Sequence, residues 1–293
     1  MDIWYNERHM KIQYHSDSLL RLVPKDFTHP TQSEKYLKAS FAKRIALLGT
    51  APTLGALCDY SWIKLEYFTT ENEPQKSLEK GFGIQIWHQV GVKKAPRGWW
   101  PLLSLLRRSS LAFLDVQGVS DTYWLQWSEH ARRQRKKWYA HQEQYGIDET
   151  SREEFLEAYE KSTLSQSLKE LFKKSLERHC RAYKNDVHFL VVREKQSRKV
   201  LAGFMTVDDF TANQSFYPVA FILPEAKKIA ASVGLVDYWI SQCQKKSLGF
   251  INLGIVWMPG DPPSWKGYSL FKALFHPKIL LFQRPFVRFY WNG

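Results

Sequence analysis

The residue of this sequence best placed to do chemistry is Lys272, near the end of a short apolar segment at 266–275 (KGYSLFKALF). The segment has helical periodicity and stops before Pro277, which cannot continue a helix. On such a helix Lys272 would share a face with Tyr268 and His276, and the anchors in the core would be Phe271, Leu274 and Phe275. An ammonium held beside packed rings is a fixed positive charge that can stabilise an oxyanion. A solvated surface lysine is the alternative.

A second group of charged residues lies in the basic stretch at 124–144 (WLQWSEHARRQRKKWYAHQEQ). We expect a helix whose apolar residues Trp124, Leu125 and Trp127 face inward. Its outer face would carry five cations: Arg132, Arg133, Arg135, Lys136 and Lys137. Such a row can neutralise RNA phosphates, although a solvated basic helix face is the more common arrangement.

A third cluster combines cations with rings in the segment KKAPRGWW. Lys93, Lys94 and Arg97 could bind a nucleotide diphosphate by charge. Trp99 and Trp100 could add stacking and cation–π contacts. A turn with two core tryptophans is the favoured alternative.

Acids, bases and metal ligands are few. Asp208, Asp209 and Asp261 are each expected to form turns, so the substrate itself would relay the proton. The nine histidines show no HxH or HExxH spacing, and the three cysteines show no CxxC spacing. We therefore predict neither a metal site nor a disulfide framework. Walker and Rossmann glycine patterns are also missing.

The elements that must position these residues form two halves. From residue 151 onward, the patterns predict the order ααβββαβαββ, with elements at 151–162, 165–183, 187–194, 199–207, 215–223, 225–246, 250–258, 266–275, 279–285 and 286–291. Asp148 or Thr150 would cap the first of these helices. In the first half we expect strands at 43–50, 62–69, 81–92 and 111–119, with a turn at 95–100 that leads into a short helix.

Length and charge bound the class of protein. The 293 residues suit two domains. No apolar run approaches the roughly 20 residues that span a bilayer, and the first residues lack the apolar core of a signal peptide, so we expect a cytoplasmic protein. The formal charge of +13 favours anionic partners such as RNA, nucleotide phosphates or an anionic membrane surface.

The end of the chain resembles a known family. The strand INLGIVW, a Gly/Pro-rich loop and WKGYSLFKALF (265–275) are similar to the signature that closes the second domain of Fem-type peptidoglycan bridge aminoacyltransferases, within the GCN5-related N-acyltransferase superfamily. Gly267, Phe271, Lys272 and Phe275 carry this resemblance. The basic stretch and the segment PEAKKIAASVGLVDYWI fit the same family, so the resemblance covers about 124–277.

The resemblance implies an α/β (α+β) fold of tandem acyltransferase-like (GNAT-like) domains, with mixed central sheets flanked by helices and a shortened first domain. We place the domains at 1–123 and 151–293, joined by a basic helical connector at 124–150. The implied activity moves an amino acid from aminoacyl-tRNA to a primary amine. The implied acceptor is the stem peptide of a peptidoglycan precursor, as a lipid-linked or nucleotide-linked muropeptide.

The resemblance also implies roles for residues. Lys272 would be catalytic, polarising the acyl carbonyl or holding the terminal phosphate region of the tRNA. The five cations of the basic stretch would bind tRNA, and the substrate-binding residues would be Arg97, Trp99, Trp257, Asp261, Lys266, Tyr268 and Phe271. No cofactor is implied beyond aminoacyl-tRNA as donor substrate. Peripheral contact with the inner face of an anionic membrane would suit the charge.

Two alternatives stay open. The first is an acyl-CoA-dependent N-acyltransferase on the same fold, which would cradle the pyrophosphate on backbone amides before the helix at 225–246. That junction, FILPEAKKIAAS, has no glycine, which argues against acetyl-CoA, although Lys227 and Lys228 could still attract it. The second is a non-catalytic protein that binds RNA or a cell-wall precursor; loss of the helix lysine would favour it, and Lys272 is present.

Overall fold

The computed structural model describes part of the chain: residues 44–48, 54–59, 64–70, 73–74, 80–89, 96–101, 109–118, 121–257, 263, 266–282 and 285–293. The chain divides into two units. The first is Met1–Ala112, Ile255–Phe271 and Lys278–Gly293, and the second is Phe113–Gly254 and Lys272–Pro277. These units differ from the predicted boundaries, because the chain leaves the second unit after β11 and its last strand returns to the first.

The first unit contains a six-stranded sheet with the order β1-β2-β3-β4-β13-β5. Its strands are β1 (Arg44–Leu48), β2 (Leu54–Asp59), β3 (Lys64–Thr70), β4 (Gly81–Gln89), β13 (Phe286–Asn292) and β5 (Trp100–Pro101). β3 and β4 run parallel, and β13 pairs antiparallel with β4 over seven positions. The predicted strand at 286–291 therefore exists, but its place in the C-terminal domain was wrong. β2 was not predicted.

The second sheet has seven strands in the order β12-β6-β11-β10-β9-β8-β7. The strands are β12 (Lys278–Phe282), β6 (Ser109–Asp115), β11 (Phe250–Ile255), β10 (Gln214–Ile222), β9 (Val200–Asp209), β8 (Val187–Glu194) and β7 (Tyr145–Glu149). The predicted meander β8-β9-β10 is confirmed as antiparallel, and β10 and β11 run parallel. The mixed α/β class is confirmed.

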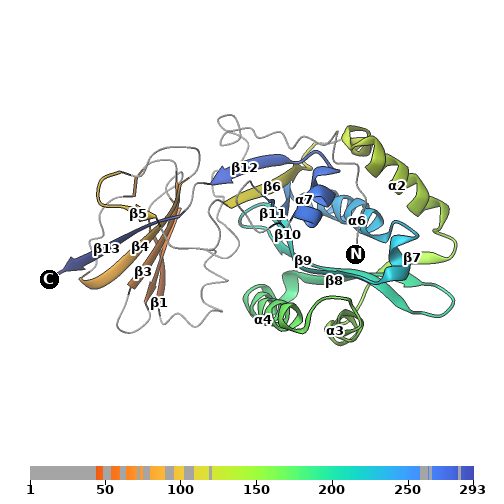
Figure 1. The fold of residues 1–293 in the computed structure, drawn as a ribbon, viewed down its shortest axis with the longest axis horizontal. Coiled ribbons are helices and arrows are strands. Elements are labelled where there is room, and N and C mark those ends of the chain that lie inside the picture. Colours follow the sequence, from red (N-terminus) through yellow and green to blue (C-terminus); the bar gives the residue numbers. More distant parts are fainter. Residues whose placement is uncertain are drawn as a thin grey trace. The chain divides into compact units, whose positions relative to one another are not determined.

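Helices cover both faces of the seven-stranded sheet (Figure 1). α3 (Arg152–Glu160) and α4 (Gln166–Tyr183) lie on one face, and α6 (Ala231–Lys245) lies on the other with α2 (Glu129–Ala140) packed on it. Every residue of β9 is buried, as expected for a strand covered on both sides. Under α3 and α4 the core is built from aromatic and aliphatic residues that include Phe155, Tyr159, Met205 and Phe221.

The start of α3 differs from the prediction. Its N-cap is Ser151, whose side chain accepts a hydrogen bond from the Glu154 amide. Asp148 lies inside β7 and Thr150 precedes the cap, so neither predicted cap is correct. A serine with an acidic residue three positions later satisfies the first amides of a helix and suits its dipole.

The basic stretch is not one helix. A 3₁₀ turn at Tyr123–Gln126 comes first, α2 begins after the cap Ser128, and the chain then turns into β7. Trp127 is buried as predicted, whereas Leu125 is 51% exposed, so its inward placement was wrong.

The predicted helix at 225–246 is interrupted. α5 (Pro224–Lys227) is a single turn, and α6 starts after Ala230, whose φ is 58°. Such a left-handed residue breaks the helical ladder. In the part of the chain that the structure describes, none of the helices is both long and apolar enough to cross a membrane.

Candidate active site

A fork between β10 and β11 organises the candidate site. The two strands pair at only three positions, from Gln214 with Phe250 to Phe216 with Asn252, although both continue further. The register of β10 with β9 also shifts between Phe216 and Val219. Pro218 lies in this bulge, where its missing N–H does not interrupt the ladder. The strands therefore part just beyond Phe216.

The β10 side of the fork presents the ring of Tyr217. This ring is stacked on Phe204 at 5.2 Å and meets Trp239 edge-on at 5.4 Å between ring centroids. Aromatic contacts on two sides limit its rotation. The fork therefore has a rigid aromatic wall at the bulge.

Gly254 forms the β11 side. Its φ is +76°, a conformation that favours glycine. Its amide donates to Asn252 Oδ1 at 2.8 Å, and Asn252 Nδ2 donates to Gln214 Oε1 at 3.3 Å. These buried amide side chains tie the end of β11 to the start of β10, which fixes the backbone where the strands separate.

Lys272 enters this fork from the last turn of α7 (Lys266–Ala273). Its side chain is 5% exposed, and Nζ lies 5.8 Å from the centroid of the Tyr217 ring. The same atom lies 3.6 Å from where a Cβ on Gly254 would stand. Burial lowers the pKa of Lys272 to about 7. The solvated-lysine alternative is therefore wrong, because the side chain is buried.

The residues after Lys272 anchor it. Leu274 and Phe275 are buried as predicted. The Phe275 ring meets Trp127 edge-on at 4.9 Å, and the Ser128 amide donates to Leu274 O at 2.9 Å. The start of α2 thus holds the end of α7, which restricts where the Lys272 side chain can point.

Other predictions about this helix need correction. Phe271 is only half-buried. Tyr268 is 39% exposed, and His276 is exposed beyond the end of α7, with φ 49°. His276 therefore does not share a helix face with Lys272 as predicted, whereas Tyr268 lies one turn before Lys272 on α7 but is exposed where Lys272 is buried.

Comparisons with solved structures agree with this architecture. FemX aligns over 90% of this chain and 92% of its own, with 7% identity and a TM-score of 0.58. The C-terminal domain of a candidate lysylphosphatidylglycerol synthetase from Agrobacterium fabrum aligns over 89% of this chain and 88% of its own, with 12% identity and a TM-score of 0.50. The chain has a FemX-like fold. A conserved protein of unknown function from Bacteroides thetaiotaomicron also has this fold. It aligns over 90% of this chain and 92% of its own, with 9% identity and a TM-score of 0.52. No family model and no curated protein matches the sequence.

Two of the predicted substrate-binding residues contact each other. Lys266 Nζ lies 5.8 Å from the ring centroid of the half-buried Trp257. The Trp257 amide donates to Ser269 Oγ at 2.6 Å, which joins the end of β11 to α7. Asp261, Lys93 and Lys94 lie outside the described residues.

The Trp-rich turn is part of the first unit's core. The Trp99 ring is 5% exposed and lies 5.3 Å from the Trp87 ring, with the Arg288 guanidinium 4.4 Å from its centroid. Trp99 Nε1 donates to Glu73 Oε1 at 2.7 Å. Trp99 is thus a core residue, as the alternative favoured from the sequence predicts, but that alternative was wrong for Trp100, which is exposed, as is Arg97.

The aspartates at the end of β9 have different roles. Asp209 forms a turn as predicted, accepting from the Ala212 amide at 3.2 Å. Asp208 does not: it binds Ser215 Oγ at 2.6 Å and Lys246 Nζ at 2.7 Å, and lies 3.3 Å from His188 Nε2. Burial alone would raise the pKa of Asp208, but hydrogen bonds from His188, Lys246 and Ser215 outweigh it and lower the pKa.

Four of the five predicted RNA-binding cations point outward on α2: Arg132, Arg133, Lys136 and Lys137 are exposed. Arg135 is the exception. Its side chain is 19% exposed, and Nε donates to Asp237 Oδ1 of α6 at 2.8 Å. Its outward placement was therefore wrong, because a carboxylate far along the chain draws the guanidinium inward.

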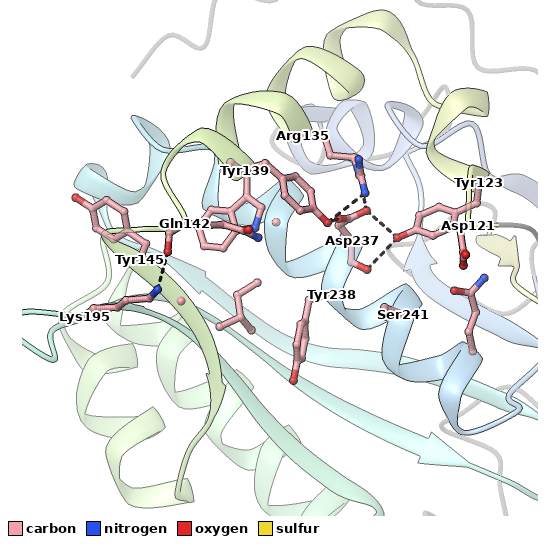
Figure 2. Close-up of a pocket in the computed structure, with 15 residues that line it drawn as sticks. Asp121, Tyr123, Arg135, Tyr139, Gln142, Tyr145, Lys195, Asp237, Tyr238 and Ser241 are labelled. Carbon is pink, nitrogen blue, oxygen red and sulfur yellow. Dashed lines mark hydrogen bonds and ion pairs between the residues drawn. The ribbon is translucent and has the colours of Figure 1, made fainter.

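Asp237 forms the centre of a network that sequence reasoning missed (Figure 2). Besides Arg135, it accepts hydrogen bonds from Tyr123 at 2.7 Å and Tyr139 at 2.8 Å. Burial and the adjacent carboxylate raise the pKa of Tyr123 well above its ordinary value. The network joins α2 to α6 beside a cavity of about 460 Å³. The only sequence signal was an aspartate on an otherwise apolar helix face.

Among the described residues, no three His, Cys, Asp or Glu side chains gather where they could hold a metal ion.

Proposed function

We propose that this protein is an N-acyltransferase that moves an aminoacyl group from aminoacyl-tRNA to a primary amine. The observation that carries the proposal is the buried Lys272 ammonium in the β10–β11 fork, beside Tyr217 and Gly254. Burial of a lysine costs free energy because it disfavours the charged form. Buried lysines with a lowered pKa are therefore found preferentially at functional sites. The FemX-like fold supports the same class of reaction.

The reaction needs one developing charge to be stabilised. The acceptor nitrogen attacks the ester carbonyl carbon, and the carbonyl oxygen becomes an oxyanion. Protonated Lys272 donates a hydrogen bond to that oxygen inside the fork, where water does not compete. The bond between the carbonyl carbon and the ribose oxygen then breaks, and the proton lost by the amine passes to that oxygen. The products are an amide and tRNA with a free hydroxyl.

The segment between β10 and α6 supports tRNA rather than acetyl-CoA as donor. A CoA pyrophosphate would need backbone amides from this segment. Here the amides of Ala226, Lys228, Ile229 and Ala230 donate to chain carbonyls within α5 and its exit. Because these donors are engaged, the junction is a poor cradle for a pyrophosphate. The exposed cations of α2, Arg132, Arg133, Lys136 and Lys137, would contact tRNA phosphates.

The acceptor we propose is the amine of a peptidoglycan precursor stem peptide. The Fem-type signature residues Gly267, Phe271, Lys272 and Phe275 support this acceptor. The name of the Agrobacterium relative, a lysylphosphatidylglycerol synthetase, indicates a lipid as the rival acceptor. Both a lipid and a lipid-linked muropeptide would be met at a membrane surface.

An exposed aromatic face in the first unit supports peripheral membrane contact. Trp291 is 73% exposed, Phe289 57% and Trp100 67%. Trp100 pairs with Val287 in register, and alternate residues of β13 share a face, so the three rings lie on one side of the sheet. Tryptophan suits the bilayer interface, and the charge of +13 suits anionic lipid.

Vesicle sedimentation tests this contact. The protein should sediment with phosphatidylglycerol vesicles and not with phosphatidylcholine vesicles, and the Phe289→Ser/Trp291→Ser variant should stay in the supernatant. If the variant sediments with phosphatidylglycerol vesicles as well as the wild type does, the contact is refuted. It is also refuted if the wild type is a dimer in solution and the variant loses only the dimer and not the vesicle binding.

The function is tested by offering the folded protein a mixed pool of charged tRNAs or acetyl-CoA, together with lipid-linked muropeptide, and following the acceptor by mass. We expect an amino acid residue to be added from tRNA by the wild type and not by Lys272→Met. Acetylation would assign the CoA-dependent alternative, and no transfer from any donor would favour a binding protein.

A further inference from the structure

The cavity of about 460 Å³ beside the Asp237 network is built by α2, β7 and α6 (Figure 2). Its size lies within the roughly 300–1,000 Å³ typical of ligand sites. α2 contributes Arg135, Trp138 and Tyr139, and the turn after it contributes Gln142; β7 contributes Tyr145 and Ile147; α6 contributes Gly234, Asp237, Tyr238 and Ser241. The buried Trp138 ring packs on Gly234, where a Cβ would come within 2.4 Å of the ring. This close approach lets α2 pack directly against α6 on one side of the cavity.

Two of the charged groups in the cavity wall, Arg135 and Asp237, bind each other. Asp237 is held by Arg135 and two phenols. The Arg135 guanidinium lies 4.8 Å from the Trp124 ring centroid and 4.5 Å from that of Tyr139. Lys195 Nζ donates to Gln142 O at 2.7 Å. Because the Arg135–Asp237 pair is internally neutralised and the Lys195 ammonium is held by a backbone carbonyl, the inner wall suits a neutral ligand with hydrogen-bonding edges.

Rings and hydroxyls can bind such a ligand. Tyr145 and Tyr238 are half-buried and line the cavity from β7 and α6, with Ser241 one turn along α6 from Asp237. Aromatic rings stack on any nucleobase, and hydroxyls can meet its edge.

Cations lie beside this cavity on the same helix. Residues three and four apart on a helix are neighbours. Exposed Arg132 is therefore adjacent to Arg135, and exposed Lys136 is adjacent to Tyr139. A ligand with a neutral ring in the cavity and an anionic chain along α2 would match both features. That is the chemistry of a nucleotide within a strand.

We propose that this cavity binds an unpaired nucleotide of an RNA strand, with its base against Tyr145 and Tyr238 and its phosphates on Arg132 and Lys136. The inference rests on the proposed RNA donor and gives that donor a docking point. The cavity would hold the strand, while Lys272 acts on the ester.

Binding is tested by fluorescence anisotropy with a short labelled single-stranded RNA. Stacking on one aromatic residue typically changes affinity by roughly tenfold or more, so Tyr238→Leu should raise Kd by about that factor. Should Tyr238→Leu melt early, Tyr145→Leu serves as the second variant. Wild-type affinity in a folded variant of either tyrosine would overturn the proposal.

Salt dependence tests the proposed binding of phosphates by α2. Arg132→Gln/Lys136→Gln should flatten the slope of log K against log salt by roughly 0.7 for each phosphate that the variant no longer neutralises. The matched control is Lys161→Gln/Lys174→Gln, which removes two exposed cations from the other face of the sheet and should leave the slope unchanged. Equal slopes for the two double variants would contradict the placement of the strand.

Two further arms separate this proposal from its neighbours. Free AMP and UDP should compete only weakly with the labelled RNA. If they compete as strongly as unlabelled RNA does, the cavity binds a free nucleotide, and the proposal that it binds an RNA strand is wrong. If pocket-dependent RNA binding persists while no donor supports transfer, the proposed function fails and the RNA site stands.

Discussion

Replacing Lys272 by methionine should stabilise the protein in a pH-dependent way. The pKa of Lys272 falls from its ordinary 10.5 to about 7, which at about 1.4 kcal/mol per pH unit is a cost of roughly 5 kcal/mol for burying the ammonium. Between these two values the unfolded chain holds a proton that the folded chain lacks. Wild-type stability therefore rises with pH across this window. The cost is fully present below about pH 7 and gone by about pH 10.5.

Lys272→Met removes this cost while keeping most of the apolar side chain. Relative to the wild type, the variant should gain up to roughly 5 kcal/mol at about pH 6.5 but only about 2 kcal/mol at about pH 9. Denaturant midpoints at each pH measure the difference, followed by hydrogen exchange of the β9 and β10 amides, which belong to the same unit as Lys272. The exposed Lys137 provides the matched control, because Lys137→Met should show no pH-dependent gain. A gain for Lys272→Met that is the same at every pH would refute the burial of a titrating ammonium.

Three further predictions concern the fork and the network. The ratio of wild-type to Lys272→Met transfer rates should fall as pH rises through about 7, because the neutral amine cannot stabilise an oxyanion; a ratio that rises would make Lys272 a general base. Gly254→Ala should lower the free energy of unfolding by about 1–2 kcal/mol, measured with denaturant, because Gly254 has a positive φ. The control is Gly267→Ala, which has open space around its Cβ position and should not destabilise the protein. Equal effects of the two substitutions would contradict backbone strain at Gly254. Arg135→Met should lower the free energy of unfolding by about 3–5 kcal/mol, since it leaves Asp237 buried with its charge partner missing. Substitution of the exposed Arg132 by methionine should change this free energy by no more than about 0.5 kcal/mol. If Arg135→Met has no effect on stability, the network does not stabilise the fold.

Most helices and strands of the second unit could be predicted from local sequence patterns. The three strands of the meander and the helices around them follow from apolar periodicity and short turns, which act within a few residues. Strand β7 was missed because its five residues YGIDE lack an apolar run and are only partly buried. The break before α6 was missed because alanine rarely adopts the left-handed φ seen at Ala230.

The site itself depends on contacts between distant segments. The sequence marks Lys272 as a lysine among apolar residues, but its burial depends on Tyr217 and Gly254, which come from other elements. Arg135 was expected in solvent because its partner Asp237 lies 102 positions away. The pairing of β13 with β4 is likewise non-local, so strand patterns alone could not assign it to the first unit.

The most direct test of the account is the single-turnover rate of aminoacyl transfer by Lys272→Met, measured on a variant shown to be folded and to bind RNA normally. Loss of one oxyanion donor typically lowers such a rate by roughly 100-fold to 1,000-fold, and we predict a loss of at least about 100-fold. A wild-type rate in this variant would contradict the assignment of the buried lysine in the β10–β11 fork as the catalytic cation.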